Sequence, residues 1–257
     1  MLHFPYMASG NRPWYRKKWL IAVLIVGAVC AAGLIYFGVQ TVKYIRLISA
    51  GQLDVSISPR DREVLARIRE VLSGPRPTAT ERGRIEIAEG NPVLGNPKAK
   101  VKIVEFLDYQ CPFSKSISDG LREFMQRHKD EVFLIVRDYP VSDIHEHAEG
   151  AARAAHCVLA QGQDRYWIFH AALFLEQDNL APERLRAQAL KAGVDAEAYD
   201  ACLKSAATAQ AVDRSFADGV LSGVVGTPTF FFNGYAFPGI IDGKTFEAVY
   251  QEVVKKL

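Results

Sequence analysis

The stretch that decides the fold is Phe106-Leu107-Asp108-Tyr109-Gln110-Cys111-Pro112-Phe113-Ser114. The apolar run Val101–Leu107 predicts a strand, and the residues from Cys111 to about His128 predict a helix. A cysteine therefore stands at a helix N-terminus, where unpaired backbone N–H groups and the helix dipole favour negative charge. Since the thiolate is the reactive form of cysteine, Cys111 is predicted to be a nucleophile. The alternative is a small, buried, hydrophobic cysteine.

A second motif, Gly226-Thr227-Pro228-Thr229-Phe230-Phe231-Phe232, lies more than a hundred residues further along the chain. A glycine and an X-Pro bond come directly before a predicted strand. Such a proline is a candidate for the cis isomer, and an ordinary trans turn is the alternative. The motif is therefore predicted to be a specified loop at the start of a strand.

The remaining elements follow from hydrophobic patterns and from glycine and proline breaks. Residues 148–216 are helical in character, and Gly162, Asn179–Pro182 and Gly193 break them into three or four helices. The other expected elements are an edge strand at Arg84–Ile87, strands at Val132–Val136, Thr229–Phe232 and Tyr235–Ile241, and a closing amphipathic helix at Lys244–Lys256. This order predicts an α/β layer architecture, with a helical insert at about residues 145–218 inside one sheet.

Over roughly residues 90–255 the sequence resembles the DsbA family of thioredoxin-fold oxidoreductases. The resemblance is carried by Asn91–Gly95, by Val104-Glu105-Phe106 leading to Cys111-Pro112-Phe113, by Tyr166-Trp167 with His170–Phe174, and by Gly226–Phe230. It implies a thioredoxin fold with an inserted helical subdomain. It also implies a nucleophilic Cys111 beside a cis-Pro loop, Thr227-Pro228, which receives the substrate backbone. Pro112, Phe113 and Thr227 are then the expected substrate-binding residues, and Cys111, Ser114 and Pro228 the catalytic ones.

Ser114 is a departure from the family pattern, which ends in a second, resolving cysteine. A hydroxyl at this position is expected to hydrogen-bond a Cys111 thiolate and favour it. It cannot attack a mixed disulfide to release it. The site is therefore predicted to act through a single thiol.

The chain has three further cysteines, Cys30, Cys157 and Cys202. Cys30 lies in an apolar run near the N-terminus. Cys157 and Cys202 both fall in the helical block, and two interpretations of them stay open. They are either buried free thiols or a structural disulfide that staples the insert.

Residues 19–39, Trp19 to Val39, contain no charged residue, which predicts a transmembrane helix. A cleaved signal peptide is the alternative, but its apolar region is normally shorter. Residues 1–18 carry four basic and no acidic side chains, so they are expected to be cytoplasmic. Residues 40–83 are predicted to be a spacer with a short amphipathic helix that begins at Ser58-Pro59 and ends before Gly74-Pro75. Residues 84–257 form the expected DsbA-like domain.

The 257 residues carry a formal net charge of +2, too little to indicate a nucleic-acid-binding surface. No nucleotide-binding motif or zinc-ligand spacing is present, so neither a cofactor nor a metal is expected. The sequence therefore predicts a single-pass, membrane-anchored thiol–disulfide oxidoreductase of the extracytoplasmic space. Its expected partners are extracytoplasmic proteins with thiols or disulfides, and a small thiol or redox partner for resolution. The alternative is a non-catalytic peptide-binding module or chaperone.

Overall fold

The computed structural model describes residues 59–239 and 242–257, together with the isolated positions 27, 30, 33, 34, 36, 39 and 42. The chain divides into two units, residues 1–61 and 62–257. The isolated positions of the first unit are helical and exposed. The predicted transmembrane helix, residues 19–39, lies mostly outside the described residues. Within the described part, no helix is both long and apolar enough to cross a membrane.

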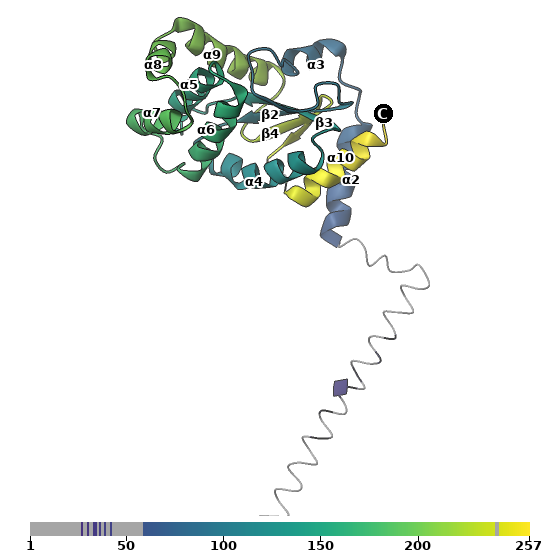
Figure 1. The fold of residues 1–257 in the computed structure, drawn as a ribbon. Helices are drawn as coiled ribbons and strands as arrows, with labels where there is room; N and C mark the ends of the chain where they lie inside the picture. The colour runs from purple at the N-terminus through teal and green to yellow at the C-terminus, as the bar shows by residue number, and fades with distance from the viewer. Residues whose placement is uncertain are drawn as a thin grey trace, which may run out of the picture. The chain divides into compact units, whose positions relative to one another are not determined.

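The second unit is built on a five-stranded sheet with the order β1-β3-β2-β4-β5 (Figure 1). The central strand β2 is parallel to β3 and antiparallel to β4. The edge strands β1 and β5 are antiparallel to their neighbours β3 and β4. The strands are β1 Val93–Gly95, β2 Val101–Leu107, β3 Val132–Asp138, β4 Thr229–Phe232 and β5 Tyr235–Pro238.

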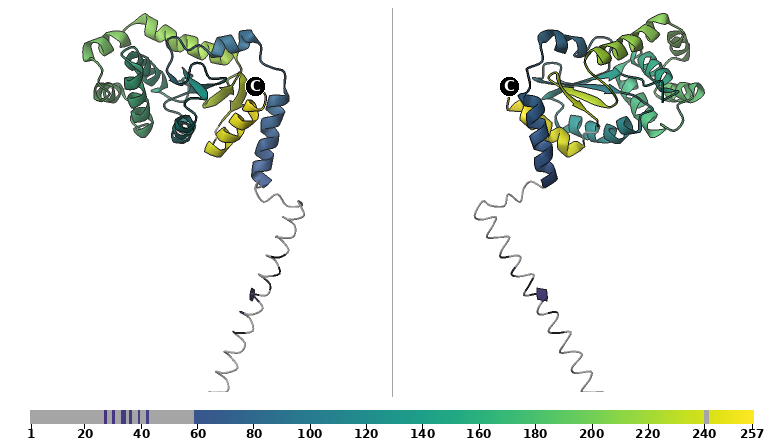
Figure 2. Two further views of the ribbon diagram at one scale, coloured as in Figure 1. Left: turned by 45° about the vertical axis from the view of Figure 1, so that its right-hand side comes forward. Right: turned by 180° about the vertical axis from the view of Figure 1, so that it is seen from behind.

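Helices cover both faces of this sheet (Figures 1 and 2). Helices α4 (Pro112–Arg127) and α10 (Gly243–Val254) pack against each other on one face, and α3 (Ala79–Ile85) and α9 (Ala206–Leu221) lie on the other. The insert between β3 and β4 consists of α5 Ala148–Leu159, α6 Gln163–Leu175, α7 Pro182–Lys191, α8 Ala196–Leu203 and α9. It thus contains five helices rather than three or four, and α9 ends after residue 218. The side chains of Asp195 and Ser205 cap α8 and α9, and the break at Ser205 was not predicted.

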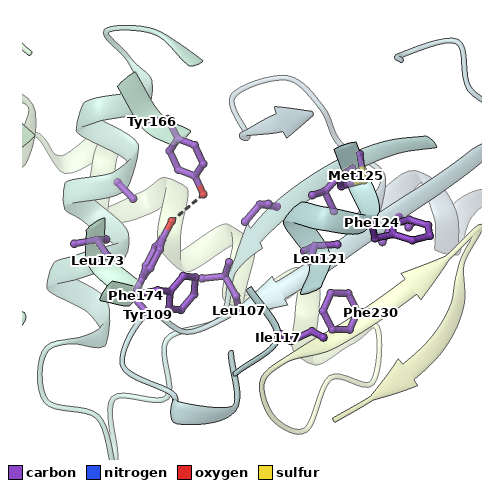
Figure 3. Packing of buried hydrophobic residues seen from close by; sticks show 14 of the residues in the cluster. Leu107, Tyr109, Ile117, Leu121, Phe124, Met125, Tyr166, Leu173, Phe174 and Phe230 are labelled. Atoms are coloured by element: carbon purple, nitrogen blue, oxygen red, sulfur yellow. Dashed lines mark hydrogen bonds between the residues drawn. The ribbon is translucent and has the colours of Figure 1, made fainter. Parts of the chain in front are cut away.

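Alternation along β2 divides the core into two clusters, one on each face of the sheet. Ile103 and Leu107 belong to the larger cluster, which includes Phe124 of α4 and extends into the insert (Figure 3). Val104 and Phe106 belong to the smaller cluster on the opposite face. By the same alternation Glu105, which is 2% exposed, points to the side of Ile103 and Leu107.

The segment before β1 corrects the predicted spacer and edge strand. Residues Arg84 and Ile85 end helix α3 instead of forming a strand at Arg84–Ile87. A capping box between Thr78 and Glu81 starts this helix, and these local bonds outweigh the short alternating pattern. The helix predicted further upstream is α2 (Pro59–Ser73), although Ser58 lies outside the described residues.

Helix α2 packs on the domain rather than standing apart from it. Its Ile68 and Leu72 are buried in the larger cluster, and its Arg69 contacts Glu252 of α10 at 3.2 Å. Strand β1, which the sequence did not predict, has three residues between two turn signals, too few to show alternation. The positions of α2 and β1 are therefore set by contacts with residues that are distant in the sequence.

Candidate functional site

Cys111 is the N-cap of α4, and it follows β2 by a four-residue step. Its backbone N–H donates to the Asp108 carbonyl, and its own carbonyl accepts from Lys115 N–H, so the chain enters the helix directly after the turn. Pro112 occupies the first helical turn, as the sequence predicted. Cys111 is 4% exposed and carries a free thiol. The sulfur therefore lies at the positive end of a helix dipole, close beneath the surface.

The Thr227-Pro228 loop meets Cys111 at this place. The Thr227-Pro228 peptide bond is cis, as predicted. Cys111 Sγ lies 3.3 Å from the Thr227 carbonyl oxygen, to which the thiol donates. Thr229 Oγ1 donates to the Gly226 carbonyl at 2.7 Å and so holds the loop before β4 begins. Two motifs separated by 116 residues thus form one site.

Ser114 is completely buried one helical turn into α4. Its Oγ accepts the backbone N–H of Asp108 at 3.4 Å. The expected hydrogen bond to Cys111 Sγ is not among the bonds of the described residues, because the cysteine turns towards the Thr227 carbonyl instead. Ser114 therefore stabilises the turn before the helix, whereas the Cys111 thiol is hydrogen-bonded to the proline loop.

The surface around Cys111 is apolar. Pro112 is exposed, Phe113 is 55% exposed, and Val225 at the start of the proline loop is 89% exposed. The predicted substrate-binding residues Pro112 and Phe113 therefore stand beside the thiol with Thr227.

Two residues that the sequence analysis did not single out fix the loop that carries Cys111. Asp108 accepts Gln110 N–H with Oδ1, and both Val141 N–H and His145 Nδ1 with Oδ2. The buried Gln177 of the insert donates from Nε2 to the carbonyls of Tyr109 (2.8 Å) and Cys111 (2.9 Å). An aspartate directly after a strand is a local turn signal, but no pattern in the sequence links Gln177 to a cysteine 66 positions away.

Two titratable groups near the site have strongly shifted pKa values. Burial raises the pKa of Glu105 on β2 to about 8, so its carboxyl is largely protonated at neutral pH. Burial lowers the pKa of His170 to about 3 and keeps that imidazole neutral. His170 Nδ1 lies 3.1 Å from Tyr109 Oη. Tyr109 Oη in turn lies 2.8 Å from Tyr166 Oη (Figure 3). Glu105, His170, Tyr109 and Tyr166 are therefore largely uncharged at neutral pH.

Cys157 and Cys202 lie apart from the site and are joined by a disulfide between α5 and α8. Of the two interpretations left open by the sequence, the structural disulfide is the one observed. In the described part of the chain, Cys30 and Cys111 are the free cysteines, and no group of three or more side chains suited to a metal ion is present.

The fold and the site define a thioredoxin-fold protein with a cysteine at a helix N-terminus facing a cis-proline loop. The family model for thioredoxin matches residues 88–252, which is more than half of the chain. The chain therefore belongs to the thioredoxin family.

Solved structures similar to this chain include a thioredoxin-like oxidoreductase and a thiol-disulfide exchange protein named as a DsbA. A thioredoxin-like oxidoreductase from Silicibacter pomeroyi DSS-3 is 26% identical, with a TM-score of 0.62 over 68% of this chain and 98% of that one. The thiol-disulfide exchange protein alpha-DsbA2 from Wolbachia pipientis is 23% identical, with a TM-score of 0.63 over 73% of this chain and 98% of that one. At 23% identity, the similarity to alpha-DsbA2 supports the shared fold only.

Among curated sequences the matches carry a different name. A Na(+)/H(+) antiporter NhaA 1 from Mycolicibacterium gilvum is 31% identical over 170 residues, which are 65% of this chain and 27% of that protein. The chain spans about a quarter of the length of the curated relatives it matches.

Proposed function

We propose that this chain is a thiol–disulfide exchange protein that acts through the single thiol of Cys111. The observation that carries the proposal is the position of Cys111 Sγ, at the N-terminus of α4 and 3.3 Å from the Thr227 carbonyl of the cis-proline loop. The thiolate is the attacking species in exchange, and a cysteine at a helix N-terminus is a position typical of reactive thiols. The exposed Phe113 and Val225 suit an extended, apolar segment of a substrate protein.

The exchange has two steps. The Cys111 thiolate attacks one sulfur of a substrate disulfide, a mixed disulfide forms, and the other substrate sulfur leaves as a thiolate. The hydroxyl of Ser114 cannot displace the substrate from this mixed disulfide. An outside thiol must attack it, and this attack regenerates the Cys111 thiolate while the outside thiol becomes disulfide-bonded to the substrate sulfur. Cys157 and Cys202 are paired with each other and supply no free thiol for this step.

The test is trapping of the mixed disulfide on a non-reducing gel. We expect the wild type to form a long-lived adduct with a disulfide-bonded protein, and to reduce insulin slowly unless a small thiol is added. The control is Cys111→Ser, which should form no adduct. Rapid turnover without added thiol, equal in the wild type and in Cys111→Ser, would contradict the proposal.

A second candidate function is a peptide-binding module or chaperone without turnover. Ser114 favours it, because this residue removes the second thiol while the apolar surface at Phe113 remains. The reaction rate of Cys111 with a thiol reagent near neutral pH separates the two functions. A fast reaction favours exchange, whereas an inert thiol with retained peptide binding favours the module.

We further propose that the domain lies on the extracytoplasmic side of a cell membrane, anchored by residues 19–39. The support is the charge-free run and the basic residues that precede it. Protease added to cells stripped of their outer layers should degrade the domain. Full protection of the domain from the protease would contradict this orientation.

A further inference from the structure

A basic cavity lies at the end of the sheet opposite to Cys111. It has a volume of about 340 Å³, and its walls come from α2, α3, the start of β2, the β4–β5 turn and the end of α10. Lys100 and Lys102 stand at the start of β2, whereas Cys111 follows its end. A strand of seven residues spans about 20 Å. The cavity is therefore separate from the thiol site and does not depend on its chemistry.

The side chains that line this cavity are strongly unbalanced in charge. The cations are Arg76, Arg82, Lys100, Lys102 and Lys256, and the one acidic side chain is Glu86. Glu86 is paired with Lys102 at 3.2 Å. Among the described residues, no ion pair joins any of the other four cations to a carboxylate. The cavity is thus lined by five positive charges and by two negative ones, which are the Glu86 side chain and the terminal carboxylate of Leu257.

The cations stand on a fixed framework. Asn233 in the β4–β5 turn accepts Lys102 N–H at 2.7 Å and donates to the Lys100 carbonyl at 3.1 Å. The stem of Arg82 lies against the same turn, where a Cβ on Gly234 would come within 2.8 Å of Arg82 Cγ. Arg82 Nη1 donates to the Pro77 carbonyl at 2.8 Å. Because the Arg82 side chain is already held in place, a ligand would lose little binding free energy in ordering it.

One wall of the cavity is aromatic. Lys256 Nζ lies 6.0 Å from the centroid of the Tyr235 ring and donates to the Leu72 carbonyl. This position holds the ammonium group at the rim of the cavity. Arg76 and Lys100 are exposed around the same cavity. Guanidinium and ammonium groups that line one cavity offer hydrogen-bond donors and positive charge that suit the oxygens of a phosphate group.

We propose that this cavity binds a phosphate-bearing anion. The phosphate would lie among Arg76, Arg82, Lys100 and Lys256, while Lys102 stays paired with Glu86. The same chemistry is offered by a free phosphate and by the headgroup of an anionic phospholipid. Binding at this end of the sheet leaves the Cys111 end open to substrate.

The test is amine labelling of the full-length protein in neutral detergent micelles, read by mass spectrometry at each lysine. One arm adds inorganic phosphate, and a second adds phosphatidylglycerol, with phosphatidylcholine as its control. We expect slower labelling of Lys100, Lys102 and Lys256, while the exposed Lys191 and Lys204 of the insert are unchanged. Slowing by inorganic phosphate identifies free phosphate as the ligand, and slowing by phosphatidylglycerol alone identifies the headgroup. High salt should weaken either effect.

The test variant is the double substitution Arg76→Gln with Lys100→Gln. The matched control is Lys191→Gln with Arg214→Gln, two residues on the exposed surface of the insert. The first pair should need about tenfold or more probe to give the same protection of Lys102 and Lys256. The control pair should behave as the wild type. The proposal is overturned if neither probe protects the cavity lysines, if Lys191 and Lys204 are protected equally, or if the first pair keeps full protection.

Discussion

The cysteines of this chain lie in two contrasting regions. Cys111 is unpaired, sits at a helix N-terminus and has exposed apolar neighbours, whereas Cys157 and Cys202 are paired between two helices of the insert. Cys157 is fully buried and belongs to the larger core cluster. The comparison teaches that position and partner, rather than residue type, separate the free cysteine that we propose for exchange from the paired cysteines of the insert.

The largest effect is expected from removal of the insert disulfide. The double substitution Cys157→Ala with Cys202→Ala opens a loop with a sequence separation of 45 residues. The loss in free energy of unfolding should be about 3–4 kcal/mol, since the disulfide restricts the unfolded chain. Urea unfolding followed by fluorescence measures it. Cys111→Ala is the control and should lower the free energy of unfolding much less. Equal losses in the two variants would contradict the distinction between a structural disulfide and an unpaired thiol.

The second prediction converts the single-thiol site into a two-thiol site. Ser114→Cys places a second thiol one helical turn from Cys111, and the two should form a disulfide. One round of insulin reduction by the reduced variant should be about a hundredfold faster than by the wild type, because the intramolecular thiol resolves the mixed disulfide at a millimolar effective concentration and the two thiols end as a disulfide. The control is Ser116→Cys on the exposed side of the same helix, which should leave this rate unchanged. No gain in Ser114→Cys would show that resolution does not limit the wild type.

The third prediction concerns pH and the strand that leads to Cys111. The pKa of Glu105 is about 8 in the folded chain against 4.5 unfolded, so the folded state keeps a proton that the unfolded state releases. Stability from this group is present below pH 4.5 and is lost as the pH rises towards 8. Relative to Glu105→Gln, the wild type should lose about 2 kcal/mol of its free energy of unfolding between pH 5 and pH 7.

Urea unfolding at a series of pH values checks this difference. His170, whose pKa is lowered to about 3, titrates in both proteins and cancels in the comparison. Glu123→Gln, on the exposed side of α4, is the control and should follow the wild type. Parallel stability curves for the wild type and Glu105→Gln would show that Glu105 is ionised in the fold.

The smallest effect is expected from Gln177, the link between the two regions. Gln177→Ala removes two hydrogen bonds to the Tyr109 and Cys111 carbonyls and should cost about 1 kcal/mol of stability. The rate of Cys111 labelling should change as well, because the loop loses its support from the insert. Gln251→Ala, on the exposed face of α10, is the control. An unchanged labelling rate would mean that Asp108 alone holds the loop.

Much of the fold was predictable because its signals are local. The apolar run of β2, the proline in the first turn of α4 and the residues before β4 all carry their information within a few positions. The predicted edge strand at Arg84–Ile87 was wrong because four alternating residues could not reveal the capping box that begins at Thr78. The three residues of β1 were missed for a related reason, since their pairing with β3 is decided by partners 38 to 42 positions away.

The sequence by itself determined which groups can do chemistry: a lone cysteine at a helix start, a serine in place of a second thiol and an X-Pro bond before a strand. These are properties of residue type and short spacing, which the chain carries before it folds. The tertiary structure alone decided that the thiol meets the Thr227 carbonyl, that Cys157 pairs with Cys202, and that Gln177 holds the Cys111 loop. It also brought five cations from four separate segments around one cavity. The physical reason is that such contacts join residues far apart in sequence, and packing of the sheet and the insert sets their distances.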